Sequence, residues 1–260
     1  MTSVTGRTQH TFRKKWGQNF LSDPNLVRKI VHAINPKPTD SILEIGPGDG
    51  ALTRQLVDKV QHLSAVEIDP MLFKQLTEEE SLQNVNFVHA DILKILVKDV
   101  VHEPSLKIVG NIPYNITSPL IFHLLDQQME WNKTFLMVQK EVADRLAARP
   151  GIKAYSRISV MVQSFLNVKK HFTISPKVFF PRPKVQSAII ELSKKPQPIV
   201  PEEDFPRFQK IVKAAFSQRR KMLKNTLNSF DFSIEIQEKI DFTRRPETLT
   251  IKEFSELAKD

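Results

Sequence analysis

The sequence predicts an α/β fold in which helices cover both faces of a mainly parallel sheet, followed by a small all-helical C-terminal domain. Two observations support this prediction. Short apolar runs typical of buried strands alternate with helical patterns through the first two thirds of the chain. Beyond a proline-rich stretch, the pattern is helical to the end.

The predicted strands follow one another along the chain. The first lies in SILEI, before a glycine-rich loop, and later ones cover 62–67, 85–89, 106–110 and 133–138. Two further strands, 170–174 and 187–192, flank a proline-rich loop, which favours an antiparallel pair at the sheet edge. The stretch SKKPQPIVP, 193–201, is typical of a linker. We therefore expect one domain over 1–197 and a second, helical one over 198–260.

The composition excludes several kinds of site. The 260 residues include no cysteine, which excludes disulfides, thiolate metal ligands and a cysteine nucleophile. The seven histidines lack the spacing of zinc ligands, so no metal is expected. No apolar run approaches the roughly 18 residues of a membrane helix, and we expect a cytoplasmic protein without membrane contact.

Positive charge is the first indication of a partner. The net charge is +9, and no acidic residue precedes Asp23, which predicts a basic N-terminal arm. Asp23 and Pro24 then form the pattern of a helix cap followed by proline in the first turn. A basic chain with clustered cations suits a polyanionic partner.

The glycine loop and two acids predict an adenosine-containing cofactor. EIGPGDG, with Gly46 and Gly48, follows a strand and precedes a helix, where glycines let the backbone approach a ligand. Glu67 ends the next strand, where an acid binds ribose hydroxyls, and Asp91 follows the third strand, where it can contact an adenine amino group. Either acid alone is explained as a helix cap, but three ligand-type strand ends in succession favour a cofactor.

The glycine spacing distinguishes between cofactors. The G-x-G-x-G pattern departs from the G-x-G-x-x-G of dinucleotide-binding proteins, which argues against a dehydrogenase. It resembles the E-x-G-x-G-x-G motif of class I methyltransferases. This resemblance implies a Rossmann-like domain that binds S-adenosyl-L-methionine.

The stretch Asn111-Ile112-Pro113-Tyr114 after the fourth strand resembles the motif of methyltransferases that act on exocyclic amines of bases. The Asn111 side-chain oxygen and the Ile112 carbonyl can accept the two hydrogens of an adenine amino group, while Pro113 holds the turn rigid. Acceptors aimed at a tetrahedral nitrogen favour the geometry formed during attack. Tyr114 offers a face for base stacking. For an isolated N-x-P-Y, a simple turn beside a core tyrosine is the better interpretation.

Taken together, the motifs resemble those of the ribosomal RNA adenine dimethyltransferases, and within them the bacterial enzymes acting on the small subunit. The resemblance covers nearly the whole chain, through GQNFLSDPN (17–25), LEIGPGDGALT, VEID, HADIL, GNIPYNITSPL, MVQKEVADRLAARPG (137–151), FFPRPKVQSAIIEL (179–192) and AFSQRRKMLKNTL (215–227). Two departures from the family pattern are visible. Asp49 stands where the family often has leucine, and Ser156 replaces a usual glycine.

The resemblance implies a set of site residues. S-adenosyl-L-methionine would contact Gln18, Asn19, Leu21, Gly46, Gly48, Glu67, Ile68, Asp91, Ile92 and Asn111. The target adenine would be held by Asn111, Ile112, Pro113 and Tyr114, with Phe180 as the opposite wall of its pocket and Phe179 in the core.

The segment 208–227 can be interpreted as one helix with about 3.6 residues per turn. Its cations then share a stripe opposite an apolar face, and this stripe consists of Lys210, Lys213, Arg220, Lys221 and Lys224. Arg219 projects onto the apolar side, so we expect it to bind a carboxylate or backbone carbonyls and fix the C-terminal helices to the large domain.

The predicted RNA-binding residues are Arg13, Lys14, Lys15, Arg182, Lys184, Lys213, Arg220, Lys221 and Lys224.

The function implied is dimethylation of N6 on two adjacent adenosines in a hairpin near the 3′ end of 16S ribosomal RNA during small-subunit biogenesis. Two alternatives remain open. One is a large-subunit RNA adenine methyltransferase that confers antibiotic resistance, and the other is a mainly non-catalytic assembly factor. We expect a monomer whose partner is small-subunit ribosomal RNA within a partly assembled subunit.

Overall fold

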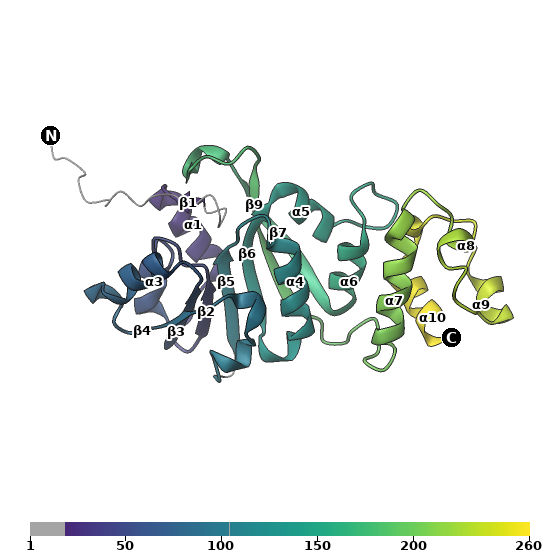
Figure 1. Cartoon of the computed structure of the whole chain (residues 1–260), viewed down its shortest axis with the longest axis horizontal. Coiled ribbons are helices and arrows are strands. Elements are labelled where there is room, and N and C mark those ends of the chain that lie inside the picture. The colour runs from purple at the N-terminus through teal and green to yellow at the C-terminus, as the bar shows by residue number, and fades with distance from the viewer. Residues whose placement is uncertain (1–18, 104) are drawn as a thin grey trace.

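The computed structural model describes residues 19–103 and 105–260, and a seven-stranded sheet forms its centre in the order β4-β3-β2-β5-β6-β9-β7 (Figure 1). Neighbouring strands from β4 to β6 are parallel, whereas β9 runs antiparallel between β6 and β7. The strands are β2 (Ser41–Ile45), β3 (His62–Glu67), β4 (Val85–His89), β5 (Leu106–Asn111), β6 (Lys133–Gln139), β7 (Leu166–Ile174) and β9 (Ser187–Lys194). The predicted fold class and the antiparallel edge are therefore confirmed.

Helices cover both faces of the sheet because successive strand side chains point to opposite sides. In β2, Ile42 belongs to a core with helices α1 (Pro24–Ile34) and α2 (Thr53–Leu56). Leu43 and Ile45 belong to a second core, which includes residues of α4 (Thr117–Asp126), α5 (Lys140–Leu146) and α6 (Arg157–Phe165). Short 3₁₀ helices lie between these elements, at Val57–Lys59, Glu80–Leu82, Ile92–Lys94, Val97–Asp99, Gln128–Glu130, Pro176–Val178, Phe216–Gln218 and Pro246–Thr248.

Aspartate caps begin two of the helices. The Asp23 carboxylate accepts from the Asn25 N–H at 2.9 Å and begins α1, as predicted. Asp69 accepts from the Met71 N–H at 2.9 Å and begins α3 (Pro70–Thr77) in the same way. A proline follows each cap, where the fixed φ suits the first turn.

A second, two-stranded sheet joins the N-terminal segment to the loop after β7. Strand β1 (Phe20–Leu21) pairs antiparallel with β8 (Phe179–Phe180). The Ser22 N–H continues the pairing with a bond of 3.0 Å to the Val178 carbonyl. No pattern in the sequence predicts strands of two residues, so this sheet was not expected.

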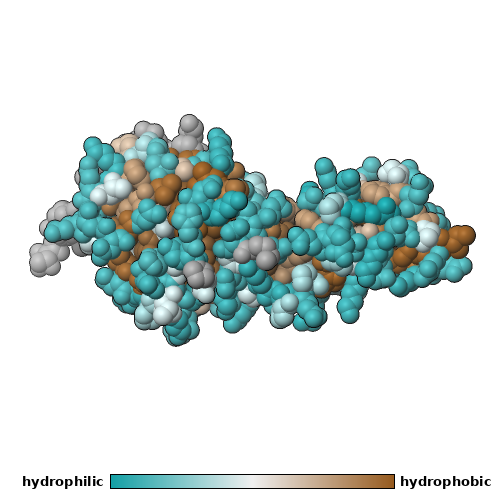
Figure 2. All heavy atoms as spheres, turned by 90° about the horizontal axis from the view of Figure 1, so that it is seen from below, coloured by the Kyte–Doolittle hydropathy of each residue, from teal (hydrophilic) through white to brown (hydrophobic). Residues whose placement is uncertain are grey.

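The C-terminal helices lie at the end of the molecule opposite β4 and α3 (Figure 1). They are α7 (Phe205–Ala215), α8 (Leu223–Thr226), α9 (Ile234–Lys239) and α10 (Ile251–Lys259). Figure 2 shows this end as a narrower part of an elongated molecule, with hydrophilic side chains over most of the visible face. The apolar core is nevertheless continuous, since Phe208 and Phe254 belong to the core of the sheet and the Phe165 and Phe205 rings meet edge to face at 4.9 Å.

The prediction of one helix over 208–227 is wrong, because α7 ends at Ala215. The backbone N–H groups of Leu223 and Lys224 bond to the carbonyls of Arg244 and Phe242 instead of to the preceding turn. These long-range bonds turn the chain away from the axis of α7. Met222, which a single helix over 208–227 would place on its apolar side, is exposed. The cations from 210 to 224 therefore do not form one helical stripe.

The predicted linker 193–201 is also packed more closely than its composition indicates. Residues 193–194 belong to β9. The N–H groups of Lys195 and Ile199 donate to the Phe165 and Ser164 carbonyls, and Val200 is fully buried. The domain boundary at 197/198 remains a prediction.

Arg219 finds the two kinds of acceptor that were predicted, although its side chain is 38% exposed rather than buried. The guanidinium donates to the Lys153 carbonyl and lies 3.9 Å from a Glu247 carboxylate oxygen. The Glu247 carbonyl accepts from the Gly151 N–H at 2.7 Å. Arg219 thus ties the C-terminal helices to the 149–155 loop.

We expect Arg219→Ala to lower the free energy of unfolding by about 1 kcal/mol, after allowance for solvent screening. Backbone hydrogen exchange should rise in the 149–155 loop and in the C-terminal helices. Arg220→Ala is the matched control, because the neighbouring arginine is exposed, and its effect should stay within about 0.5 kcal/mol. Unchanged exchange in Arg219→Ala, with RNA affinity alone reduced, would contradict the structural role.

Candidate active site

The carboxyl ends of β2, β3, β4 and β5 meet at one edge of the sheet and enclose a cavity of about 820 Å³, part of it open to solvent. In parallel α/β sheets this edge is where ligands bind. Nine predicted cofactor residues line the cavity: Asn19, Leu21, Gly46, Gly48, Glu67, Ile68, Asp91, Ile92 and Asn111. Gln18 lies outside the described residues. The structure therefore brings the described part of the predicted set together.

The glycine loop bends sharply from β2 toward α2. Gly46 and Gly48 have φ of +67° and +62°, a region that favours glycine. The Gly48 N–H donates to a Glu67 carboxylate oxygen at 3.2 Å. A Cβ on Gly48 would lie 3.1 Å from the Phe20 ring, so the N-terminal strand packs directly on this loop. Glycine is needed here both for the turn and for this close contact.

Glu67 and Asp91 differ in how they are held. Glu67 is 2% exposed and accepts from the backbone N–H groups of Asp69, at 2.9 Å, and Gly48. Burial raises the pKa of Glu67, and these backbone hydrogen bonds act against the rise. Asp69, not Glu67, caps the following helix, whereas Asp91 does act as a cap by accepting from Leu93 at 3.1 Å. The helix-cap interpretation thus applies to Asp91, which also lines the cavity, and fails for Glu67.

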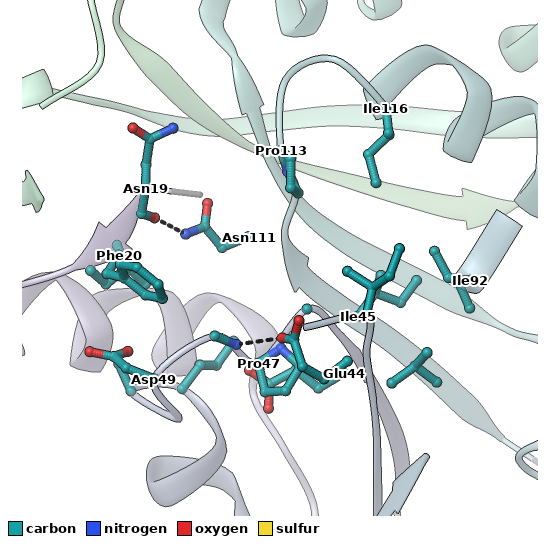
Figure 3. Close-up of a pocket in the computed structure, with 18 of the residues that line it drawn as sticks. Asn19, Phe20, Glu44, Ile45, Pro47, Asp49, Ile92, Asn111, Pro113 and Ile116 are labelled. Carbon is teal, nitrogen blue, oxygen red and sulfur yellow. Dashed lines mark hydrogen bonds between the residues drawn. The ribbon is translucent and has the colours of Figure 1, made fainter. Parts of the chain in front are cut away.

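Asn111 ends β5 with its side-chain orientation fixed. Its Nδ2 donates to the Asn19 backbone carbonyl at 2.7 Å, as Figure 3 shows. Because the nitrogen is committed to this acceptor, Oδ1 is the atom left to accept from a ligand. Gly110, just before, allows β5 to lie close to β2, since a Cβ there would be 2.6 Å from the Ile45 carbonyl oxygen.

The next two residues form a rigid turn. The Ile112 N–H donates to the Met137 carbonyl at 3.3 Å, and the Ile112 side chain is buried. The Pro113 carbonyl accepts from the Ile116 N–H at 3.1 Å and from the Thr117 hydroxyl. Among residues 19–103 and 105–260, no group donates to the Ile112 carbonyl. The turn therefore leaves one backbone acceptor beside the Asn111 amide.

The two aromatic residues predicted for the base pocket lie outside the lining of this cavity. Tyr114 is half-buried, and its hydroxyl is 2.7 Å from the Ser187 hydroxyl at the start of β9. Burial raises the pKa of the Tyr114 phenol, which stays protonated near neutral pH. Phe180 is 54% exposed on β8, whereas Phe179 is buried, as predicted. Phe180 is thus accessible to a partner.

Sequence reasoning overlooked Glu44, which also lines the cavity. Glu44 is 2% exposed, and its Oε2 has no hydrogen-bond partner in the described part of the chain. Burial is the main reason why the pKa of Glu44 is raised to about 7. The Thr53 hydroxyl lowers this pKa, whereas the negative charges of Glu67 and Asp49 raise it further. Its position as the acid of E-x-G-x-G-x-G could have identified it from the sequence.

The predicted RNA-binding residues that the structure describes are all exposed. They are Arg182 and Lys184, in the loop that follows Phe180, and Lys213, Arg220, Lys221 and Lys224 in the C-terminal part. Arg13, Lys14 and Lys15 lie outside the described residues. Within the described ranges, no cluster of histidine or acidic side chains could hold a metal ion, and no helix is long and apolar enough to cross a membrane.

The sheet order, the glycine loop and the amide at the end of β5 define a Rossmann-like methyltransferase of class I. Comparison with known proteins narrows the class. A family model described as ribosomal RNA adenine dimethylase matches residues 9–259. The chain therefore belongs to the ribosomal RNA adenine dimethylase family.

Relatives and solved structures agree with this assignment. The chain is 42% identical over 253 residues to the ribosomal RNA small subunit methyltransferase A of Saccharophagus degradans, covering 96% of this chain and 94% of the relative. It is 43% identical over 258 residues to the protein of that name from Pseudomonas syringae pv. tomato, covering 98% and 96%. A dimethyladenosine transferase from Plasmodium falciparum superposes with a TM-score of 0.77 at 27% identity, covering 92% and 95% of the two chains. The 23S rRNA methyltransferase ErmE gives 0.72 at 25% identity, covering 93% and 98%.

The raised pKa of Glu44 has a consequence for stability. A carboxyl group whose pKa is higher in the folded than in the unfolded chain costs stability as pH rises from its ordinary value of 4.5 to about 7. We expect Glu44→Gln to raise the free energy of unfolding at pH 8 by up to about 3 kcal/mol and to change it far less at pH 5. Chemical denaturation of the ligand-free wild-type and Glu44→Gln chains at pH 8 and at pH 5 measures the change in the free energy of unfolding at each pH. Equal effects at the two values would contradict the prediction.

Proposed function

We propose that this chain transfers methyl groups from S-adenosylmethionine to adenine N6 in small-subunit ribosomal RNA, dimethylating two adjacent adenosines in a hairpin near the 3′ end. The observation that carries the proposal is the Asn111 amide, whose nitrogen is held by the Asn19 carbonyl at 2.7 Å. That bond leaves Oδ1 to accept a hydrogen from an exocyclic amine. The Ile112 carbonyl is the second acceptor.

The cavity supports S-adenosylmethionine as the cofactor. The Glu67 carboxylate suits ribose hydroxyls, and Asp91 suits the adenine amino group. The apolar residues Ile68 and Ile92 lie beside these acids and suit the faces of an adenine ring. The bound cofactor supplies a methyl group attached to a positively charged sulfur. The sulfur is a good leaving group, because it becomes a neutral thioether when the methyl group is transferred.

The protein's part in the reaction is to orient the amine. The lone pair of adenine N6 is delocalised into the ring, so the planar amine is a poor nucleophile. Acceptors at Asn111 and Ile112 draw the two N–H groups toward a tetrahedral arrangement and expose the lone pair. These hydrogen bonds are stronger in the transition state than in the ground state, which is the condition for catalysis. No strong base is required, and the proton leaves to water.

Tyr114 and Phe180 are proposed to hold the base. Phe180 stands exposed on β8, beside the basic residues Arg182 and Lys184. An extruded adenine can stack on an aromatic face while its neighbouring phosphates contact the cations. Lys213, Arg220, Lys221 and Lys224 on the proposed 198–260 domain would contact phosphates further along the RNA.

The relatives' names favour the small subunit as substrate, since those at 42–43% identity are small-subunit methyltransferases, whereas the large-subunit enzyme ErmE is 25% identical. We propose that the protein is a cytoplasmic monomer. We further propose that it acts on a partly assembled subunit, because separated basic patches suit a folded RNA more than a linear sequence. The large-subunit enzyme and the assembly factor remain the alternatives.

The first test is methyl transfer from labelled S-adenosylmethionine to unmodified small and large ribosomal subunits. We expect dimethyladenosine in the small subunit, and a loss of about 100-fold or more in rate with Asn111→Ala, which removes one acceptor. Label in large subunits would instead support the resistance enzyme. Tight binding to small subunits without any label would support the assembly factor.

Phe180 allows the base site to be tested apart from the cofactor cavity. Phe180→Ala should reduce the rate of RNA methylation by about tenfold or more through loss of base stacking. Its affinity for S-adenosylmethionine should not change, because Phe180 does not line the cavity. Phe180→Tyr keeps the aromatic face and should keep the rate. An equal loss in both variants would argue against stacking.

A further inference from the structure

The cavity at the strand ends is lined by four carboxyl groups, those of Glu44, Asp49, Glu67 and Asp91. No lysine, arginine or histidine is among its lining residues in the described part of the chain. Glu67 and Asp91 already accept backbone N–H bonds. Glu44 differs, because its buried Oε2 has no hydrogen-bond partner among residues 19–103 and 105–260.

An unpartnered buried carboxylate is costly, and the groups that face Glu44 do little to reduce the cost. Glu67 from β3 and Asp49 from the glycine loop add negative charge, while α2 contributes the Thr53 hydroxyl and the positive charge of Arg54. Arg54 is itself engaged, since it donates to both carboxylate oxygens of Glu79 at 2.6 and 2.5 Å and to the Asp49 carbonyl at 2.7 Å. The stabilising positive charge for Glu44 is therefore expected from a ligand.

The cofactor and its product differ in the charge on the sulfur atom. S-adenosylmethionine carries a sulfonium, an ammonium and a carboxylate, and so has a net positive charge. S-adenosylhomocysteine, formed when the sulfur loses its methyl group and keeps the electron pair, has no net charge. Electrostatic attraction is stronger in a cavity of low dielectric constant than in water. A negatively charged cavity therefore favours S-adenosylmethionine over S-adenosylhomocysteine.

We propose that Glu44 is the proton-linked charge sensor of the cofactor cavity: it releases its proton to solvent when S-adenosylmethionine binds and keeps it when S-adenosylhomocysteine binds. The inference rests on the proposed function, because it assumes this cofactor. Glu44 thereby determines specificity for the methyl donor over the product. Its protonation lowers the negative charge of the cavity while the uncharged product is bound.

The proposal predicts the direction of a pH effect. The pKa of Glu44 is about 7 before binding and falls in the complex with the cationic cofactor. Affinity for S-adenosylmethionine should therefore rise with pH below about 7 and level off above it. Between pH 6 and pH 8 the gain is at most about tenfold, and affinity for S-adenosylhomocysteine should change much less.

Isothermal titration calorimetry of the full chain at pH 7, in buffers of different ionisation enthalpy, counts the protons released. We expect S-adenosylmethionine to release about half a proton more than S-adenosylhomocysteine. Glu44→Gln should bind both ligands and abolish this difference. Asp49→Asn is the matched control, since it removes a partly exposed acid of the same cavity and should keep the difference.

The outcomes separate the two proposals. Binding of both ligands with the same proton count in the wild-type chain overturns the role of Glu44 and leaves the proposed function intact. The role of Glu44 is also overturned if the difference in proton release persists in Glu44→Gln, or if it disappears only in Asp49→Asn. No binding of S-adenosylmethionine overturns both. If Glu44→Gln does not fold, the wild-type ratio of the two dissociation constants from pH 6 to pH 8 decides, and a constant ratio overturns the inference.

Discussion

The hydrogen bond from the Asn111 side chain to the Asn19 carbonyl is the contact on which the geometry of the site depends. A carboxamide can rotate by half a turn, and only a fixed acceptor opposite its nitrogen determines which atom faces a ligand. Asn19 is positioned by the pairing of Phe20 and Leu21 with β8. Three segments distant in sequence must therefore pack before the amide is oriented. The same pairing places Phe180 beside the strand that packs on the glycine loop, so the proposed cofactor site and the proposed base site share one support.

The site is built at a cost that the rest of the fold offsets. Glu44 and Glu67 are both buried, and burial raises the pKa of each. Their position follows from topology, because neighbouring parallel strands end at the same edge and bring together the side chains near those ends, here Glu44 of β2 and Glu67 of β3. The two apolar cores on either side of the sheet hold these strand ends in place. Buried acids proposed to bind a ligand can be kept where they destabilise the fold because the packing beneath them is extensive.

The sequence predicts those parts of the molecule whose determinants are local. The strand predictions 62–67 and 85–89 match β3 and β4, since apolar runs between turn residues carry their own pattern. The end of α7 at Ala215 could not be predicted, because it depends on bonds from Leu223 and Lys224 to residues some 20 positions further along. The β1–β8 pairing is too short to leave a pattern. The motif E-x-G-x-G-x-G could have identified Glu44 from the sequence, but its burial and the lack of a partner for its Oε2 among the described residues are visible only in the structure.

The way the C-terminal helices are attached bears on how RNA would be recognised. Phe205 and Phe208 pack into the core of the sheet, and Arg219 binds the Lys153 carbonyl, so apolar and polar contacts both join the two parts. The cations after Ala215 lie in a turn and a short helix rather than along one face. A linear polyanion would follow a stripe, whereas separated cations on one packed frame fit phosphates at fixed positions. On the proposed function, such a frame would favour a folded RNA, and the exposed Phe180 would stack on the base that this RNA presents.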